Sequence, residues 1–173
     1  VEMLEDEQSK KILVRAFERM NELINELAQI ERVTTQSFEP NFEYTSLGEV
    51  VQRTRDLLIN ESERLCIEVE NDALITDVNL LALALKNLLD NGIKYSKDKQ
   101  VCLRSIENGL EVISKGEVLQ HPLSYYLEPF SQEEKRSSGF GLGLYIVNAI
   151  VGKLGYKLAY RHEEGKNCLL YTS

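Results

Sequence analysis

The sequence predicts an α+β protein in which helices cover one face of a mixed β-sheet. Three observations support this fold class. Residues 1–33 contain no glycine or proline and show a helical hydrophobic period. From residue 42 onward, helical patterns alternate with short strand patterns. Two pairs of expected strands are separated by turn sequences, Asn108-Gly109 and Glu164-Gly165.

Composition limits the classes of function. The chain has 173 residues, of which 43% are hydrophobic, so it can build one sizeable core and is not a disordered chain. Its net charge of -8 argues against nucleic acid as a partner. No apolar run approaches the roughly 18 residues of a membrane span, so we expect no membrane contact in this chain. Cys66, Cys102 and Cys168 are widely spaced, odd in number and not in metal-ligand spacing, and we expect reduced thiols.

The first segment, residues 1–33, is predicted to be one long amphipathic helix. Its apolar residues recur at alternating spacings of four and three, at Leu13, Phe17, Met20, Ile24 and Leu27. A narrow seam of this kind is typical of a coiled coil or helical bundle and needs a partner. That partner is a second copy of the chain or a neighbouring helix, or else the chain's own domain. Residues 34–41 are polar, include Pro40, and indicate a linker to a compact domain over residues 42–173.

The compact domain is expected to contain alternating short strands and helices. A capping-box pattern, Ser46 followed by Glu49, marks the start of one helix, and Asp77 caps another that runs to about Ile93. The remaining expected elements are strands at 42–45, 65–70 and 74–76, a hairpin over 101–113, a loop over 114–141, a helix over 142–154, and two terminal strands.

The helix that follows Asp77 ends in a polar run. Asn87 and Asn91 are four residues apart and share one face, which Lys94 extends. Amide oxygens are hard ligands that Mg²⁺ accepts, and lysine supplies a positive charge to phosphate. The pattern indicates a metal–phosphate site. A solvated helix face has the same composition, so the spacing alone leaves both interpretations open.

A second polar motif lies ahead of the next helix, where Gly139, Gly141 and Gly143 alternate. Glycine lets the backbone approach a ligand, and a helix N-terminus offers unpaired N–H groups to an anion. The segment has the outline of a phosphate cradle, although its spacing is not that of the dinucleotide fingerprint. Flexible linkers share this composition, so the segment alone is weak evidence.

Together, the two motifs resemble the ATP-binding domain of sensor histidine kinases, in the Bergerat-fold (GHKL) superfamily. The resemblance covers about residues 42–173. It aligns Asn87 and Asn91 with the N box, residues 139–144 with the second glycine box, and residues 127–130 with the F box. It implies a Bergerat-type α/β sandwich that binds ATP and Mg²⁺.

The resemblance also implies residue roles. It makes Asn91 the Mg²⁺ ligand and gives Asn87 and Lys94 catalytic roles at the phosphates. The segment 114–138 would be a mobile lid. The implied nucleotide contacts are Asn91, Tyr95, Ser114, Gly116, Phe130, Gly139, Gly141, Leu142, Gly143 and Leu144.

Residues 1–33 resemble the second helix of the dimerisation and phosphotransfer hairpin, with residues 19–24 as a typical stretch. The resemblance implies a homodimer that phosphorylates a histidine on the first helix of that hairpin and then passes the phosphoryl group to a response regulator. Because the chain starts at Val1 rather than Met, we expect a fragment whose first helix lies upstream. It would be the cytoplasmic portion of an inner-membrane-anchored bacterial sensor. His121 and His162 are expected to be ordinary surface or structural residues.

One departure from the family concerns the first glycine box, D-x-G-x-G. Here Ser114 replaces the aspartate, Gly116 remains, and Val118 replaces the second glycine. A serine hydroxyl can accept the adenine amino hydrogen, but without charge assistance. The leading hypothesis is a histidine kinase core. The alternative is a pseudokinase or dimeric signalling scaffold that binds nucleotide weakly.

Overall fold

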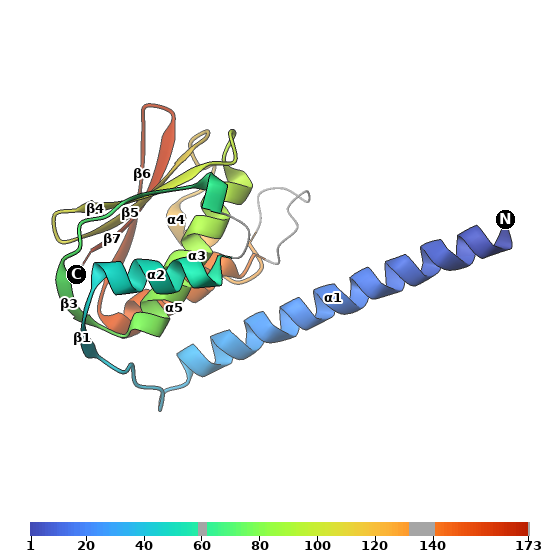
Figure 1. Cartoon of the computed structure of the whole chain (residues 1–173), viewed down its shortest axis with the longest axis horizontal. Helices are drawn as coiled ribbons and strands as arrows, with labels where there is room; N and C mark the ends of the chain where they lie inside the picture. Colours follow the sequence, from blue (N-terminus) through green and yellow to red (C-terminus); the bar gives the residue numbers. More distant parts are fainter. Residues whose placement is uncertain (59–61, 132–140, 173) are drawn as a thin grey trace.

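We analysed a computed structural model of the chain, which describes residues 1–58, 62–131 and 141–172. A long helix projects from a compact α/β domain (Figure 1). In chain order, the elements are α1 (Glu2–Thr34), β1 (Glu43–Ser46), α2 (Leu47–Leu57), a 3₁₀ turn (Ser62–Arg64), β2 (Leu65–Glu68), β3 (Ala73–Thr76), α3 (Val78–Tyr95), β4 (Val101–Ile106), β5 (Gly109–Lys115), α4 (Leu123–Tyr126), α5 (Gly143–Leu154), β6 (Lys157–Glu163) and β7 (Lys166–Thr172).

The sheet is mixed, as the sequence predicts. Its five strands have the order β2-β4-β5-β7-β6, in which β2 and β4 are parallel and the other neighbours are antiparallel. A separate antiparallel pair joins β1 to β3. Helices α2, α3 and α5 cover one face of the sheet (Figure 1). The fully buried core side chains between these layers include Leu81, Leu85, Leu89, Leu103, Leu110, Ile146 and Ile150.

Local sequence explains where the helices begin. The hydroxyl of Ser46 caps α2 and accepts a hydrogen bond from the N–H of Glu49 at 3.3 Å. The carboxylate of Asp77 caps α3 by accepting from the N–H of Leu80 at 3.0 Å, and its other oxygen accepts from the N–H of Asn41 at 2.8 Å. Both predicted caps are confirmed, and Asp77 also fixes the segment that leads into β1.

Two local predictions were wrong. The hairpin turn consists of Glu107 and Asn108, rather than Asn108 and Gly109, because Gly109 already pairs with Ile106 in the ladder. Asn108 takes a φ of 66°, which asparagine tolerates better than most residues. In addition, the predicted loop over 114–141 contains the short helix α4, in which Tyr125 and Tyr126 stack edge to face.

The seam of α1 is exposed in this single chain. Its residues Phe17 and Ile24 are 62% and 57% exposed, whereas Val33, near the end of the helix, is buried. Near its C-terminal end, α1 lies against α5 (Figure 1). The ammonium of Lys153 donates to the carbonyl oxygens of Thr35 (3.2 Å) and Phe38 (3.4 Å) in the connector. Over the part of the chain that the structure describes, no helix combines the length and apolarity that a bilayer span requires.

Candidate functional site

The two amide side chains predicted on one helix face lie together at the junction of α3 and α5. A Cβ atom on Gly143, the first residue of α5, would lie 3.5 Å from both amide atoms of Asn91 and 3.8 Å from Oδ1 of Asn87. The Nδ2 atom of Asn87 donates to the carbonyl oxygen of Leu83 at 3.0 Å, which leaves Oδ1 on the side of Gly143. The asparagine motif of α3 and the glycine motif before α5 therefore lie next to each other, and Gly143 has no side chain to separate them.

Close packing fixes the position of α3 beneath this junction. A Cβ atom on Gly92 would lie 2.4 Å from Cγ2 of Val101, so no larger residue fits between α3 and β4. Gly92 therefore lets the helix approach the sheet closely beside Asn91. This packing holds the amide of Asn91 on a rigid element, which suits a group that positions a ligand.

A second constraint joins the ends of the loop before α5. The N–H of Phe130 donates to the carbonyl oxygen of Gly141 at 3.1 Å. Gly141 has a φ of 72°, and a Cβ atom there would lie 2.5 Å from the carbonyl oxygen of Ser131. Phe130 also has a positive φ, and its side chain is 60% exposed. The predicted F box and second glycine box are thus bonded backbone to backbone, while predicted Gly139 lies outside the described residues.

The end of α3 meets the end of β5 at a third part of the site. Tyr95 is 58% exposed, and the ammonium of Lys94 lies 5.9 Å from its ring centroid. The carbonyl oxygen of Tyr95 lies 4.0 Å from the Cβ position of Gly116. Ser114 is half-buried and lies two residues beyond Val112, whose side chain contacts α3. Since alternate residues of a strand share a face, Ser114 lies on the helix-covered side of the sheet.

Three residues that sequence reasoning did not select hold the loop after Ser114. The amide of Asn167 donates to the carbonyl oxygen of Glu117 at 3.0 Å and accepts from the hydroxyl of Tyr160 at 2.5 Å. His162 Nε2 lies 3.0 Å from the carbonyl oxygen of Gly116. The β6–β7 register pairs His162 with Asn167 and so brings both residues to this loop, and no local sequence pattern encodes that register.

An ion pair at the surface also links the loop that contains Gly116 and Glu117 to the end of α3. Glu117 pairs with Lys97, which follows α3. The hydrogen bond and the positive charge of Lys97 lower the pKa of Glu117 below its usual value. The loop is therefore tied on one side to the end of α3 and on the other to the terminal hairpin.

Two predicted contacts of the second glycine box are core side chains. Leu142 is 1% exposed, and Leu144 packs against the buried core. Their side chains anchor the start of α5, so only their backbone atoms can face a ligand. Their backbone N–H groups belong to the N-terminal turn of α5, where an anion is favoured.

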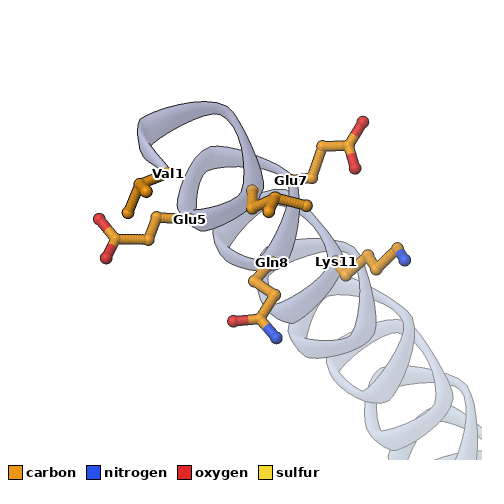
Figure 2. Close-up of a pocket in the computed structure, with 6 residues that line it drawn as sticks. Val1, Glu5, Glu7, Gln8 and Lys11 are labelled. Atoms are coloured by element: carbon orange, nitrogen blue, oxygen red, sulfur yellow. The ribbon is translucent and has the colours of Figure 1, made fainter.

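A hollow elsewhere on the molecule lies far from this junction. Figure 2 shows residues that line it, among them Val1, Glu5 and Lys11, all on the first turns of α1. These side chains belong to one exposed helix and form no enclosed cavity. We therefore place the candidate site at the α3–α5 junction.

Comparison with known proteins defines the class. Residues 76–172 match the model of the histidine kinase-, DNA gyrase B-, and HSP90-like ATPase family. The matched region contains α3, α5 and everything between them, including β4, β5 and α4. The chain belongs to this ATPase family.

Curated relatives of the chain are sensor kinases. It is 35% identical over 171 residues to the sensor histidine kinase ArsS of Helicobacter pylori, covering 96% of this chain and 40% of the relative. It is 26% identical over 181 residues to the sensor histidine kinase GraS of Staphylococcus haemolyticus, covering 96% of this chain and 52% of that protein. The chain thus spans 40% of the length of one of these relatives and 52% of the length of the other.

Solved structures share the fold. The histidine kinase AdeS of Acinetobacter baumannii aligns with a TM-score of 0.74 and 20% identity, over 94% of this chain and 82% of that one. Full-length ShkA in complex with AMPPNP aligns with a TM-score of 0.69 and 18% identity, over 93% of this chain and 36% of that one. The predicted Bergerat-type α+β fold is confirmed.

Proposed function

We propose that this chain is the ATP-binding and catalytic portion of a sensor histidine kinase, which directs the γ-phosphoryl group of Mg-ATP to a histidine of a dimerisation helix. The observation that carries the proposal is the approach of Asn87 and Asn91 to Gly143 at the start of α5. It combines hard oxygen ligands with the positive end of a helix, and that combination suits a metal-bound polyphosphate.

The residues present fit Mg²⁺ and a nucleotide. A Cβ atom on Gly143 would occupy the space before both amides, so the glycine keeps that space open for a ligand. In the proposed roles, Asn91 would hold Mg²⁺, Asn87 would hold the adjoining phosphate region, and Lys94 would neutralise phosphate charge. Mg²⁺, when bound, would neutralise charge that develops on the phosphate oxygens. The protein's contribution is chiefly positioning, because phosphoryl transfer to an imidazole nitrogen needs no strong base.

The remaining predicted contacts keep their proposed roles around these groups. Tyr95, Ser114 and Gly116 lie where α3 meets β5, and we assign them to the adenine side. Phe130, Gly141, Leu142, Gly143 and Leu144 form the loop ends and the helix start on the phosphate side, the two leucines through their backbones. Gly139 retains its proposed role in the glycine box.

Neither histidine of the chain suits the role of phosphoacceptor. His162 is engaged with the carbonyl oxygen of Gly116. His121 stacks on Tyr125 with ring centroids 4.2 Å apart. We therefore propose that the acceptor histidine belongs to a helix that partners α1, and that a response regulator receives the phosphoryl group. In this proposal, residues 1–33 are the second helix of the dimerisation hairpin, 34–41 the linker, 42–173 the catalytic domain, and the parent protein is membrane-anchored with this portion in the cytoplasm.

Calorimetry with ATP tests the metal assignment. The wild-type chain should bind ATP more tightly with Mg²⁺ than without it, and Asn91→Ala should lose that difference while keeping its circular dichroism spectrum. Asn79→Ala is the matched control, because Asn79 lies in the first turn of the same helix and its amide oxygen accepts a hydrogen bond from Arg53. Equal wild-type affinity with and without Mg²⁺ would exclude Asn91 as the ligand.

Phosphotransfer distinguishes the kinase from the weakly binding scaffold. The chain, supplied with labelled ATP, should transfer acid-labile label to a separate polypeptide that carries the acceptor helix. Asn87→Ala and Asn91→Ala should abolish the transfer. The scaffold hypothesis, which Ser114 favours, predicts no transfer and little binding at millimolar ATP. Label on His121 or His162 would contradict the proposed acceptor.

Self-association tests the role of α1. The exposed seam predicts that the chain is a dimer. The double variant Phe17→Glu, Ile24→Glu should be a monomer when both proteins are compared by analytical ultracentrifugation. Asn25→Glu combined with Gln29→Glu is the control, because it adds charge to exposed positions of α1 off the seam. If the wild type sediments as a monomer at high concentration, the seam does not pair two copies of this chain.

A further inference from the structure

The sheet has a second group of chemically active side chains, on the face away from the helices. Strands β2 and β4 are parallel, and their register places Cys66 directly beside Cys102. The neighbouring residue Leu103 is fully buried against the helices, so Cys102 lies on the opposite face. Glu68, two residues after Cys66 on β2, shares that face. Cys66 and Glu68 are exposed, and Cys102 is half-buried.

The three side chains converge. The two Sγ atoms and one carboxylate oxygen of Glu68 all lie within 4.8 Å of one another. The Sγ of Cys66 lies 3.7 Å from Oε1 of Glu68. A tetrahedral zinc ion, with bonds of about 2.3 Å to sulfur and about 2.1 Å to oxygen, holds its ligand atoms roughly 3.6–3.8 Å apart. The separation between Cys66 and Glu68 therefore matches a tetrahedral ligand set, and the two separations from Cys102 are at most 4.8 Å.

We propose that Cys66, Cys102 and Glu68 bind a thiophilic divalent cation of the zinc class, with water in the fourth position. Two sulfur ligands select a soft or borderline ion over Mg²⁺ and Ca²⁺, which prefer oxygen. The site is thus distinct in chemistry from the amide site at the α3–α5 junction, and it lies on the other face of the sheet.

Neighbouring charges are compatible with a dication. Two thiolates and a carboxylate carry three negative charges, which exceed the charge of one zinc ion by one. Arg104 is the register partner of Glu68 and supplies a positive charge on the same face. Its Nε donates to the buried carboxylate of Glu111 at 2.7 Å, and Arg161 donates to the same carboxylate at 3.0 Å. Arg104 is therefore held beside the site by Glu111, outside the ligand set.

A bound ion would also join β2 to its neighbour β4 in the main sheet. Among the residues that the structure describes, the four-residue strand β2 pairs with β4 alone in that sheet. Ligands from both strands would cross-link this edge, so occupancy should stabilise the folded chain by mass action. The site therefore predicts a thermal shift as well as a binding signal.

Cobalt provides the direct test. The reduced, metal-free chain is titrated with Co²⁺, and the thiolate-to-cobalt charge-transfer absorption is followed, with Zn²⁺ then displacing the cobalt. We expect saturation at one ion per chain and a higher melting temperature with Zn²⁺. Cys66→Ser and Cys102→Ser should each lower affinity at least tenfold, and Glu68→Gln should lower it several-fold.

Cys168→Ser is the matched control, because β5 separates the backbone of β7 from that of β4. It should retain the absorption and the thermal shift. Nucleotide binding by each variant gives an independent check of folding. The proposal is overturned if no saturable thiolate band forms, if Cys168→Ser removes it, or if saturation occurs at half an ion per chain, which would place the site between two copies.

Discussion

The N–H of Phe130 and the carbonyl oxygen of Gly141 are 3.1 Å apart and form a hydrogen bond that brings the two ends of the intervening segment together. At this point, Gly141 adopts a left-handed conformation and passes against the backbone of Ser131. The start of α5, and with it Gly143, is positioned by this contact. Substitutions at Gly141, Gly143, Gly152 and Gly155, in this region and in α5 with its C-terminal cap, therefore separate packing from ligand binding.

Gly141→Ala should destabilise the chain more than Gly155→Ala. Both glycines have positive φ, 72° and 78°, so both variants incur the left-handed penalty of about 1–2 kcal/mol. Only at Gly141 would the new Cβ also overlap the carbonyl oxygen of Ser131, whereas nothing lies within 4 Å at Gly155. Urea denaturation measures the difference. Equal losses of unfolding free energy in the two variants would show that the contact between Gly141 and Ser131 is not tight in solution.

Gly143→Ala should fold normally and bind Mg-ATP at least tenfold more weakly. The new methyl group makes ordinary contacts of 3.5 Å with Asn91, so it is tolerated, but it fills the space before the amides. Gly152→Ala is the control in the same helix, with nothing within 4 Å of its Cβ position. That variant should gain about 0.5–1 kcal/mol of stability and keep its affinity. Calorimetry and thermal denaturation on both variants give the comparison; full ATP affinity in Gly143→Ala would move the site elsewhere.

Ser114→Asp should raise ATP affinity several-fold and lower GTP affinity. A charged acceptor improves a hydrogen bond by about 1 kcal/mol, which is several-fold in affinity, and it repels the guanine carbonyl. The wild type should discriminate poorly between the two nucleotides. Lys115→Ala is the control, because it makes the same change in net charge, one residue away and on the opposite face of β5.

Competition against a fluorescent nucleotide measures these affinities. The adenine assignment of Ser114 fails if the wild type strongly prefers ATP and Ser114→Asp leaves that preference unchanged. Val118, which is exposed, replaces the second glycine of the box and does not fill the core. It therefore leaves the inner face at Ser114 available for the substitution.

Glu26→Gln should make the free energy of unfolding of the chain less dependent on pH. Burial raises the pKa of Glu26 above its ordinary value of 4.5, and the positive charges of Lys86 and Lys94 oppose this shift in part. The folded chain therefore binds the proton more tightly than the unfolded chain. Stability from this group is present below pH 4.5 and is lost as pH rises through the raised pKa.

Urea denaturation at a series of pH values above 4.5 measures this effect. Glu26→Gln should be less sensitive to pH in that window than the wild type, and Glu31→Gln, at an exposed position of the same helix, should match the wild type. Identical pH profiles for wild type and Glu26→Gln would show that the carboxyl of Glu26 is solvated.

Local sequence patterns predicted those parts of the structure that depend on neighbours along the chain. Ser46 and Asp77 cap helices because a short polar side chain can reach the N–H two or three residues on. Asn87 and Asn91 share a face because the helix repeats every 3.6 residues. No local pattern predicts that these two asparagines lie close to Gly143, because Asn91 and Gly143 are 52 positions apart in the sequence. Only the resemblance to a family implies that contact.

Other parts depend on register and burial, which no local pattern encodes. The bonds of Asn167 and His162 to the loop around Gly116 arise where the β6–β7 hairpin lies beside β5, so they depend on strand pairing about 50 residues away. Leu142 lies in a glycine-rich motif, yet its side chain is core, because burial depends on the layers above and below it. The paired thiols of Cys66 and Cys102 are 36 residues apart and meet only through the parallel register of β2 and β4.

Helix α5 begins at Gly143, beside Asn91. Its next-to-last residue, Lys153, donates hydrogen bonds to the carbonyl oxygens of Thr35 and Phe38 in the connector. Twelve residues of α-helix form a stiff rod about 18 Å long. This rod has one end at the proposed phosphate site and the other at the base of α1. A tilt of α5 in response to the proposed nucleotide would therefore displace the connector at Thr35 and Phe38, and a movement of α1 would reach the two amides through the same helix.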